Sequence, residues 1–146
     1  MSSWNKIKTE KDIEKLMNSY CGFHDSCIVS VSYESGTSVD SEGIMHFSDE
    51  NGHRMHVIFH SQMVKEKLEL LFVGLRQVHL VGWQDNYTCE LFDAHLSIKK
   101  QLLPGKPKEQ IVWASYSEFE VEDIDNTISE PAYTYIVSNK LSWRLI

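Results

Sequence analysis

The sequence predicts a mainly β protein of the α+β class. We expect an antiparallel sheet, sandwich or partly open barrel of about nine strands, with one N-terminal helix packed against it. Apolar and polar residues alternate through much of the chain after Cys27, which is the pattern of half-buried antiparallel strands. Glycine and proline breaks separate these segments at short intervals. A clear helical period occurs only near the N-terminus.

The size and composition of the chain predict one globular domain over residues 1–146. The chain is 42% hydrophobic and 24% charged, as is usual for globular proteins, and a domain of this length needs no metal or disulfide to form a core. The formal net charge is −7. Because nucleic-acid binders carry a basic footprint, this balance argues against a nucleic-acid partner.

The three cysteines, Cys21, Cys27 and Cys89, are an odd number without metal-ligand spacing and do not form a disulfide framework. The N-terminal residues lack the apolar run of a signal peptide. No segment approaches the roughly 18 apolar residues of a membrane span. We therefore expect a cytoplasmic protein that neither binds a membrane nor is secreted.

The expected helix begins after Thr9, a good N-cap, with Asp12 three residues later as the partner of a capping box. Gly22 stands where a helix of this length would end. The apolar stripe of the helix consists of Ile13, Leu16, Met17 and Tyr20.

The first expected strand runs from Cys27 to Tyr33, with the odd-numbered residues Cys27, Val29, Val31 and Tyr33 on one face. Two further strands would form a hairpin around a loop at residues 50–52. Because inward residues must face each other, the register would place Phe47 opposite Met55 and His46 opposite His56.

The rest of the chain continues this alternation. The further expected strands cover residues 68–72, 75–81, 87–98 with a bulge near residue 91, 111–116, 119–124, 133–137 and 141–146. We expect residues 138–140 to form the turn of a final hairpin. The proline-containing segment at residues 103–108 is a clear break.

The three residue types of a hydrolytic triad stand together as His24, Asp25 and Ser26. Neighbouring residues of an extended chain point to opposite faces, so these side chains cannot form one relay among themselves. As catalytic residues, one or two of them would join partners from elsewhere. The alternative is a local role, in which Asp25 or Ser26 binds nearby backbone groups.

Seven histidines, four of them between residues 45 and 61, form a second candidate site. In the expected hairpin, His46 and His56 lie opposite each other and would supply two ligands to a zinc ion. His60 shares their face but stands about 13 Å from His56 along the strand. The alternative is a solvated outer face of the sheet, which predicts no metal and no cofactor.

A third candidate is an acidic strip on the expected strand at residues 119–124. Charged side chains on a strand can attract a cationic partner or protect a sheet edge from aggregation, and a plain solvated face is the alternative. The candidate binding residues are Glu118, Glu120, Glu122, Asp123 and Asp125.

The segment Phe23 to Ser26 (FHDS), which follows a short helix and precedes the first strand, resembles a group of small uncharacterised bacterial proteins with the same arrangement. Some small proteins of this kind accompany toxin systems as immunity-type factors. The resemblance implies an immunity-like role and no catalytic residue.

These observations together predict a non-enzymatic module that binds another protein, with a cationic partner where the acidic strip makes the contact. Two alternatives stay open. One is a metal-dependent or hydrolytic enzyme that uses the histidines and Asp25. The other is a self-associating module that forms a homodimer through exposed strand edges.

Overall fold

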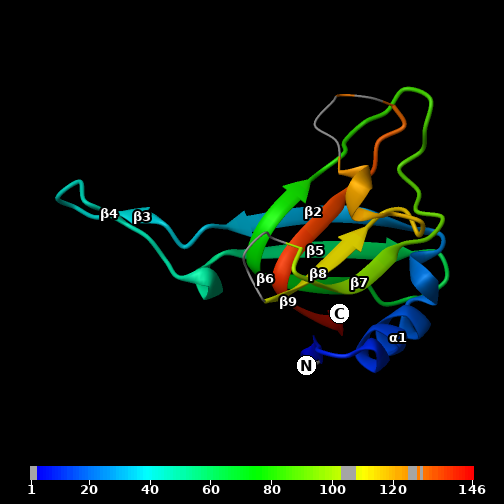
Figure 1. The fold of residues 1–146 in the computed structure, drawn as a ribbon. Helices are drawn as coiled ribbons and strands as arrows, with labels where there is room; N and C mark the ends of the chain where they lie inside the picture. The colour runs from blue at the N-terminus through cyan, green and yellow to red at the C-terminus, as the bar shows by residue number, and fades with distance from the viewer. Residues whose placement is uncertain (1–2, 103–107, 125–127, 129) are drawn as a thin grey trace.

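Nine strands and one α-helix make up the described part of the computed structural model, which covers residues 3–102, 108–124, 128 and 130–146 (Figure 1). The helix is α1 (Glu10–Ser19). The strands are β1 (Asn5–Ile7), β2 (Ser26–Glu34), β3 (Ser38–Val39), β4 (Met45–His46), β5 (Arg54–Ser61), β6 (Leu68–His79), β7 (His95–Lys100), β8 (Glu109–Ala114) and β9 (Tyr135–Leu145). The mainly β class with one N-terminal helix is confirmed.

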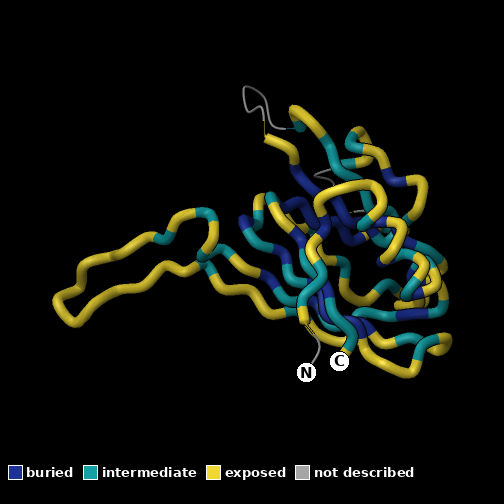
Figure 2. The backbone as a smooth tube through the Cα atoms, turned by 90° about the horizontal axis from the view of Figure 1, so that it is seen from below, coloured by how far each residue is buried: buried dark blue, intermediate teal, exposed yellow. Residues whose placement is uncertain are grey.

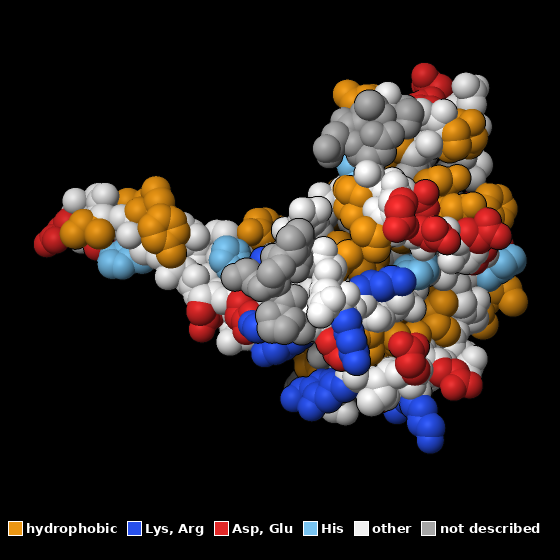
Figure 3. Space-filling model, in the orientation of Figure 1, with side chains coloured by type: hydrophobic (Ala, Val, Ile, Leu, Met, Phe, Trp, Pro, Cys, Tyr) orange, Lys and Arg blue, Asp and Glu red, His pale blue; other side chains and the backbone are white. Residues whose placement is uncertain are grey.

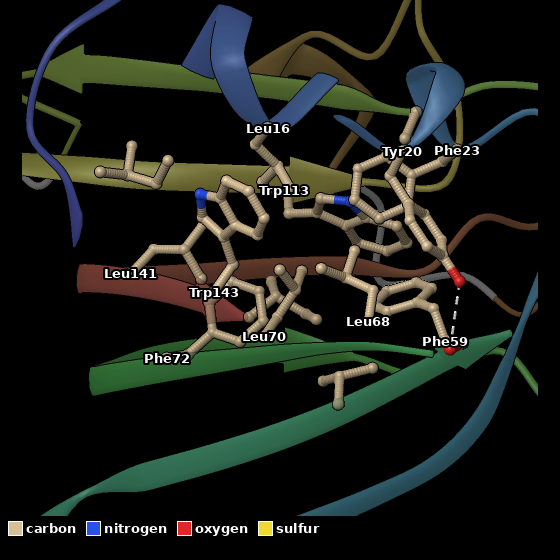
Figure 4. Packing of buried hydrophobic residues seen from close by; sticks show 14 of the residues in the cluster. Leu16, Tyr20, Phe23, Phe59, Leu68, Leu70, Phe72, Trp113, Leu141 and Trp143 are labelled. Carbon is tan, nitrogen blue, oxygen red and sulfur yellow. Dashed lines mark hydrogen bonds between the residues drawn. The ribbon is translucent and has the colours of Figure 1, made fainter. Parts of the chain in front are cut away.

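Helix α1 begins where the sequence predicts. The Thr9 side chain accepts a hydrogen bond from the backbone N–H of Asp12, and the Asp12 carboxylate accepts one from the N–H of Thr9 at 2.9 Å. This capping box satisfies two backbone donors that the first turn leaves free. On its apolar face the helix buries Leu16, and the following Tyr20 donates from its hydroxyl to the carbonyl of Phe59 at 3.3 Å (Figure 4).

The main sheet is open and antiparallel, in the order β2-β5-β6-β9-β8-β7. Strand β8 pairs with the first half of β9, and β1 pairs with its second half, residues 141–143. The predicted turn at residues 138–140 is wrong, because β9 continues through it. Gly74 of β6 has a φ of 70° and lies against the side chain of Asn139, and the register between β6 and β9 shifts just beyond it, between residues 75 and 77.

The main core lies between α1 and one face of the sheet (Figure 4). At its centre Phe23, Phe59 and Trp113 pack edge to face, with ring centroids 5.1 to 5.7 Å apart. Such aromatic pairs contribute about 0.5–1.5 kcal/mol beyond the burial of their area. The predicted alternation holds in β5 and β6, whose core residues are Met55, Val57, Phe59, Leu68, Leu70 and Phe72.

A smaller apolar cluster covers the opposite face of β8 and β9. Phe119 packs there against residues of both strands, such as Val112 and Val137. The strand predicted at residues 119–124 is wrong, because the chain forms a turn and then a 3₁₀ turn at Val121–Asp123. This path places Phe119 over the sheet, and it explains why β8 is buried on both faces.

Two other predicted strands need correction. A bulge between Ile28 and Ser30 shifts the alternation in β2, so that Ile28 packs against the core and Val29 is 53% exposed. Of the strand predicted over residues 87–98, only its end belongs to β7. Before it, Leu91 makes a single bridge to Ser26.

Residues 35–53 form an arm that projects from one end of the sheet (Figures 1 and 2). Within the arm β3 pairs with β4, so that Val39 lies opposite Met45. The predicted pairing of Met45 and Phe47 with β5 is wrong, because β2 and β6 occupy both edges of β5. The alternation of inward residues in β5 is satisfied equally by pairing with residues 45–47 or by pairing with β2 and β6. Pairing with β2 and β6 builds a sheet of several strands, which is more stable than an isolated hairpin.

Candidate functional site

The turn between α1 and β2 holds the first set of predicted site residues. Cys21, Gly22, Phe23 and Asp25 all have positive φ, between 52° and 66°. This conformation costs roughly 1–2 kcal/mol for a residue with a Cβ atom. Phe23 is fully buried in the core, and the N–H of Asp25 donates to the carbonyl of Leu91 at 2.9 Å. Tertiary contacts therefore hold this unfavourable turn in place.

His24 and Asp25 form a surface pair, with 2.9 Å between Nδ1 and Oδ2. The positive φ of Asp25 takes this residue out of the simple alternation that separates neighbours on a strand. A hydrogen bond from Glu90 to Asp25, together with the like charge of Asp25, raises the pKa of the Glu90 carboxyl. Glu90, which no local pattern in the sequence links to this turn, joins the pair from a segment far along the chain.

Ser26 does not join this group. Its Oγ donates to the carbonyl of Phe23 at 2.6 Å, and the residue is 3% exposed. The single proton of this buried hydroxyl is directed at a carbonyl oxygen, which is not a general base that could activate Ser26 as a nucleophile. The structure therefore gives Ser26 the local role that the sequence analysis offered as the alternative.

The two histidines of the predicted metal site lie apart. His46 sits on the arm, where its Nε2 is 2.7 Å from Oδ2 of Asp40. His56 lies on β5 beside Glu69, at 3.4 Å. The prediction that they face each other is wrong, because β4 does not pair with β5. Among the described residues, no three His, Cys, Asp or Glu side chains lie close enough to hold a metal ion.

Glu69 is a buried carboxylate on the face of the sheet opposite the main core, and it is 9% exposed. Arg144 donates from Nε to Glu69 at 2.7 Å, and its guanidinium stacks 4.3 Å from the ring centre of Trp4. A buried charge needs such a partner to avoid a large desolvation cost. This ionic pair accounts for the buried carboxylate as a structural feature.

The predicted acidic strip does not form a single line of side chains. Glu118 accepts a hydrogen bond from the Tyr116 hydroxyl at 2.9 Å. Glu120 and Asp123 bond to each other's backbone at the 3₁₀ turn. Glu122 is exposed beside them, and Asp125 lies outside the described residues. A continuous strip requires strand alternation, which this turn segment does not have.

An open hollow of about 590 Å³ lies between this turn and the outer side of β7. Figure 3 shows acidic side chains gathered on this part of the body. Burial lowers the pKa of His95, which favours its neutral form. The charged groups that line the hollow are the carboxylates of Glu118, Glu120 and Asp123 and the ammonium group of Lys99. Its lining residues are His95, Lys99, Tyr116, Ser117, Glu118, Phe119, Glu120 and Asp123.

Four apolar side chains are exposed on the arm, and the predicted hairpin would have buried two of them, Met45 and Phe47. Figure 3 shows apolar surface along the arm. The sequence signal was present, since the same alternation that predicts burial also describes an apolar face that awaits a partner. The four side chains and their exposed fractions are Val39 59%, Ile44 53%, Met45 54% and Phe47 77%.

The base of the arm is fixed to the body. Ser48 donates from Oγ to the carbonyl of Ser35 at 2.9 Å, and it packs so closely on Gly36 that a Cβ there would overlap it. Glu50 accepts hydrogen bonds from Lys108 at 2.8 Å and from Asn139 at 2.7 Å. The hydrogen bond and the positive charge of Lys108 lower the pKa of the Glu50 carboxyl. The arm therefore leaves the sheet from a defined base.

Comparison of the chain with protein-family models, with curated protein sequences and with solved structures finds no significant match. The resemblance of the FHDS segment to immunity-type proteins therefore stays a prediction. No helix among the described residues is long and apolar enough to cross a membrane.

Proposed function

We propose that the protein acts by binding another protein, without catalysis, and that the arm makes the contact. The observation that supports this most strongly is the set of four large apolar side chains exposed on the arm, residues 39–47. Single exposed apolar residues are normal on a protein surface, whereas a gathered set of them marks an interaction site.

The fixed base of the arm favours this proposal on energetic grounds. Binding by a mobile segment loses affinity to the entropy of ordering it. Ser48 joins the two ends of the arm through its hydrogen bond to Ser35. Glu50 fixes this base to Lys108 and Asn139 of the body before any partner arrives. Part of that entropic cost is therefore already met in the fold.

We place this binding module in a reducing compartment such as the cytoplasm, and we give it an immunity-like, inhibitory role. All three cysteines are free, which suits a compartment that keeps thiols reduced. The inhibitory role follows from the resemblance of Phe23–Ser26 to immunity-type proteins. An inhibitor of this kind needs only a surface that covers its target.

The test of the proposal compares two matched double variants. Met45→Asp/Phe47→Asp places charges on the arm, and Leu80→Asp/Trp83→Asp places them on side chains that are 54% and 81% exposed elsewhere. A partner captured by the wild-type chain and then purified should bind the arm variant at least about tenfold more weakly. The control variant should bind as the wild type does. Equal binding by both variants would contradict the role of the arm.

The acidic hollow is a second candidate contact, for a cationic segment of the partner. Glu118, Glu120 and Asp123 line it, and complementary charge speeds association and selects partners. Glu118→Lys should slow association with such a partner and reduce its dependence on salt. Glu122→Lys, which changes an exposed carboxylate outside the hollow, is the matched control. If the two variants bind alike, the hollow is not the contact.

A further inference from the structure

The two edges of the main sheet differ in how they are protected. Strand β7 carries Lys99 and Lys100 among its six residues, and lysines on an edge strand discourage pairing with other chains. Strand β2 has nine residues and one charge, Glu34 at its end, with no lysine, arginine or proline. Among the described residues, only the bridge from Leu91 to Ser26 pairs with this edge. The edge is therefore open over residues 28–34.

We propose that the partner of the arm is a second copy of this chain, joined by a two-fold axis along the open edge of β2. This inference rests on the proposed role of the arm in binding a protein, and it leaves the acidic hollow as the contact for the target of the inhibitory role. An antiparallel pairing centred on Val31 places Ser30 of each copy opposite Ser32 of the other, and it brings Tyr33 of one copy beside Val29, at the bulge of the other.

The side chains of Val29 and Tyr33 are 53% and 52% exposed in the single chain. The two-fold axis repeats their contact, so the pairing covers Val29 and Tyr33 of both copies. Glu34 is the one charged residue of β2 and lies at its end, far from the axis at Val31, so no like charges of the two strands face each other.

The same symmetry carries each arm along the body of the other copy. Val39 follows Glu34 by five residues, which span at most about 16 Å at the rise of an extended chain, since Gly36 between them has a φ of 71°. Val39 therefore passes the end of β2 in the second copy and reaches the region around Asp25. Two large apolar side chains are exposed there, Phe92 at 68% and Met63 at 59%. The arm would cover them.

The positions of these two side chains follow from backbone hydrogen bonds. Phe92 is the residue after Leu91, which exchanges two hydrogen bonds with Asp25 and Ser26 at 2.9 and 2.7 Å. Met63 is the residue after Gln62, whose N–H donates to the carbonyl of Asp25 at 2.9 Å. Both therefore flank the beginning of β2. One symmetric contact thus accounts for the open edge, the apolar arm and the apolar side chains beyond the edge.

Area and charge both bear on this arrangement. A stable interface buries roughly 800 Å² on each partner, more than a short edge pairing supplies, so the arms are needed to complete it. Each copy carries a net charge of −7, and the two bodies repel each other at low ionic strength. Backbone pairing and apolar burial must overcome this repulsion. The dimer should therefore tighten as salt is added, whereas a complex with a cationic partner weakens.

Sedimentation equilibrium of the purified full-length chain tests the proposal over about 1–100 µM protein. The wild-type chain should be a dimer at the upper end of this range and should dissociate less at high salt. The arm variant Met45→Asp/Phe47→Asp and the edge variant Ser30→Lys/Ser32→Lys should each weaken the dimer at least about tenfold. In the proposed register, the edge variant places lysines opposite each other across the two-fold axis.

Two control variants carry the same added charges at exposed positions elsewhere: Leu80→Asp/Trp83→Asp for the arm and Gln77→Lys/Asn86→Lys for the edge. They should sediment as the wild type does, and circular dichroism should show all variants folded. A wild-type chain that stays monomeric throughout, or a dimer that neither the arm nor the edge variant weakens, would overturn the inference. A monomer would leave the arm's role in protein binding to be decided by the capture experiment, so the two failures are distinguishable.

Discussion

The arm and the body of the sheet use apolar side chains in opposite ways. In the body, Phe59, Phe72 and Trp113 are fully buried between the sheet and α1. In the arm, Phe47 is 77% exposed and Met45 is 54% exposed. Figure 2 shows the arm as an almost unbroken exposed segment beside the buried strands. Both regions belong to one chain and share residue types, so their difference lies in what surrounds them.

Because of this difference, the apolar side chains of the body stabilise the folded chain, whereas those of the arm are available for association with another protein. Burying a large apolar side chain contributes roughly 1.5–3 kcal/mol to folding, and the side chains of the arm make little of that contribution in the single chain. These side chains can contribute the free energy of their burial when the arm binds another protein surface. Substitutions in the body should therefore lower stability, and substitutions in the arm should change association alone.

The largest loss should follow Trp113→Ala. The indole ring is fully buried between Phe23 and Phe59, and truncation of such a residue costs about 3–5 kcal/mol. Trp113→Phe should cost clearly less, because it keeps an aromatic ring and removes an indole N–H that has no acceptor among the described residues. Urea unfolding measures both. Equal losses for the two variants would show that ring packing does not carry the stability of this site.

A smaller loss is expected for Tyr20→Phe. The hydroxyl donates to the carbonyls of Phe59 and Glu66 at 3.3 and 3.4 Å, and burial raises the pKa of Tyr20 to about 12. The group therefore stays protonated as a donor at neutral pH. Removing a hydrogen bond of this kind costs about 1 kcal/mol, which thermal or urea unfolding would detect. A variant more stable than the wild type would contradict this assignment.

His95 should make stability depend on pH. Burial lowers the pKa of His95 in the folded chain, so the unfolded chain binds its proton more readily. The stability from the neutral ring is present above the usual histidine pKa of about 6.5 and is lost as the pH falls toward the folded-state value. The variant His95→Gln lacks this proton uptake. The urea midpoint of its unfolding should therefore fall less than that of the wild type between about pH 8 and pH 5.5. Parallel pH profiles for the two proteins would contradict the assignment.

The smallest effect on folding should come from the arm. Phe47→Ala removes a side chain that is 77% exposed, and surface substitutions of this kind stay within about 0.5 kcal/mol. Stability should be measured at low protein concentration, where any dimer has dissociated. A loss comparable to that of Trp113→Ala would show that the arm belongs to the core and would remove the distinction between the two regions.

The sequence predicts those parts of the fold that depend on local patterns. The capping box of Thr9 and Asp12 and the alternation in β5 and β6 describe contacts that neighbouring residues determine. Local patterns of this kind do not determine which strands pair when the strands lie far apart in the sequence. The parity that favours a hairpin between residues 45 and 59 is equally satisfied when β5 pairs with β2 and β6.

The candidate site was predicted less well for the same reason. The acidic residues near Glu118 lie on a turn, because Phe119 is drawn over β8 and β9 to cover an apolar face. Neither the nearness of Glu90 to Asp25 nor the burial of Glu69 beside Arg144 leaves a local signal. These contacts follow from the three-dimensional path of the chain.

Amide hydrogen exchange at two protein concentrations tests most directly whether the arm and the β2 edge form a contact between copies. We predict that amides in residues 28–34 and 38–46 exchange more slowly as the concentration rises from about 1 to about 100 µM. Amides of β7, on the protected edge, should exchange at the same rate at both concentrations. Exchange in the arm and in β2 that does not depend on concentration would contradict the account.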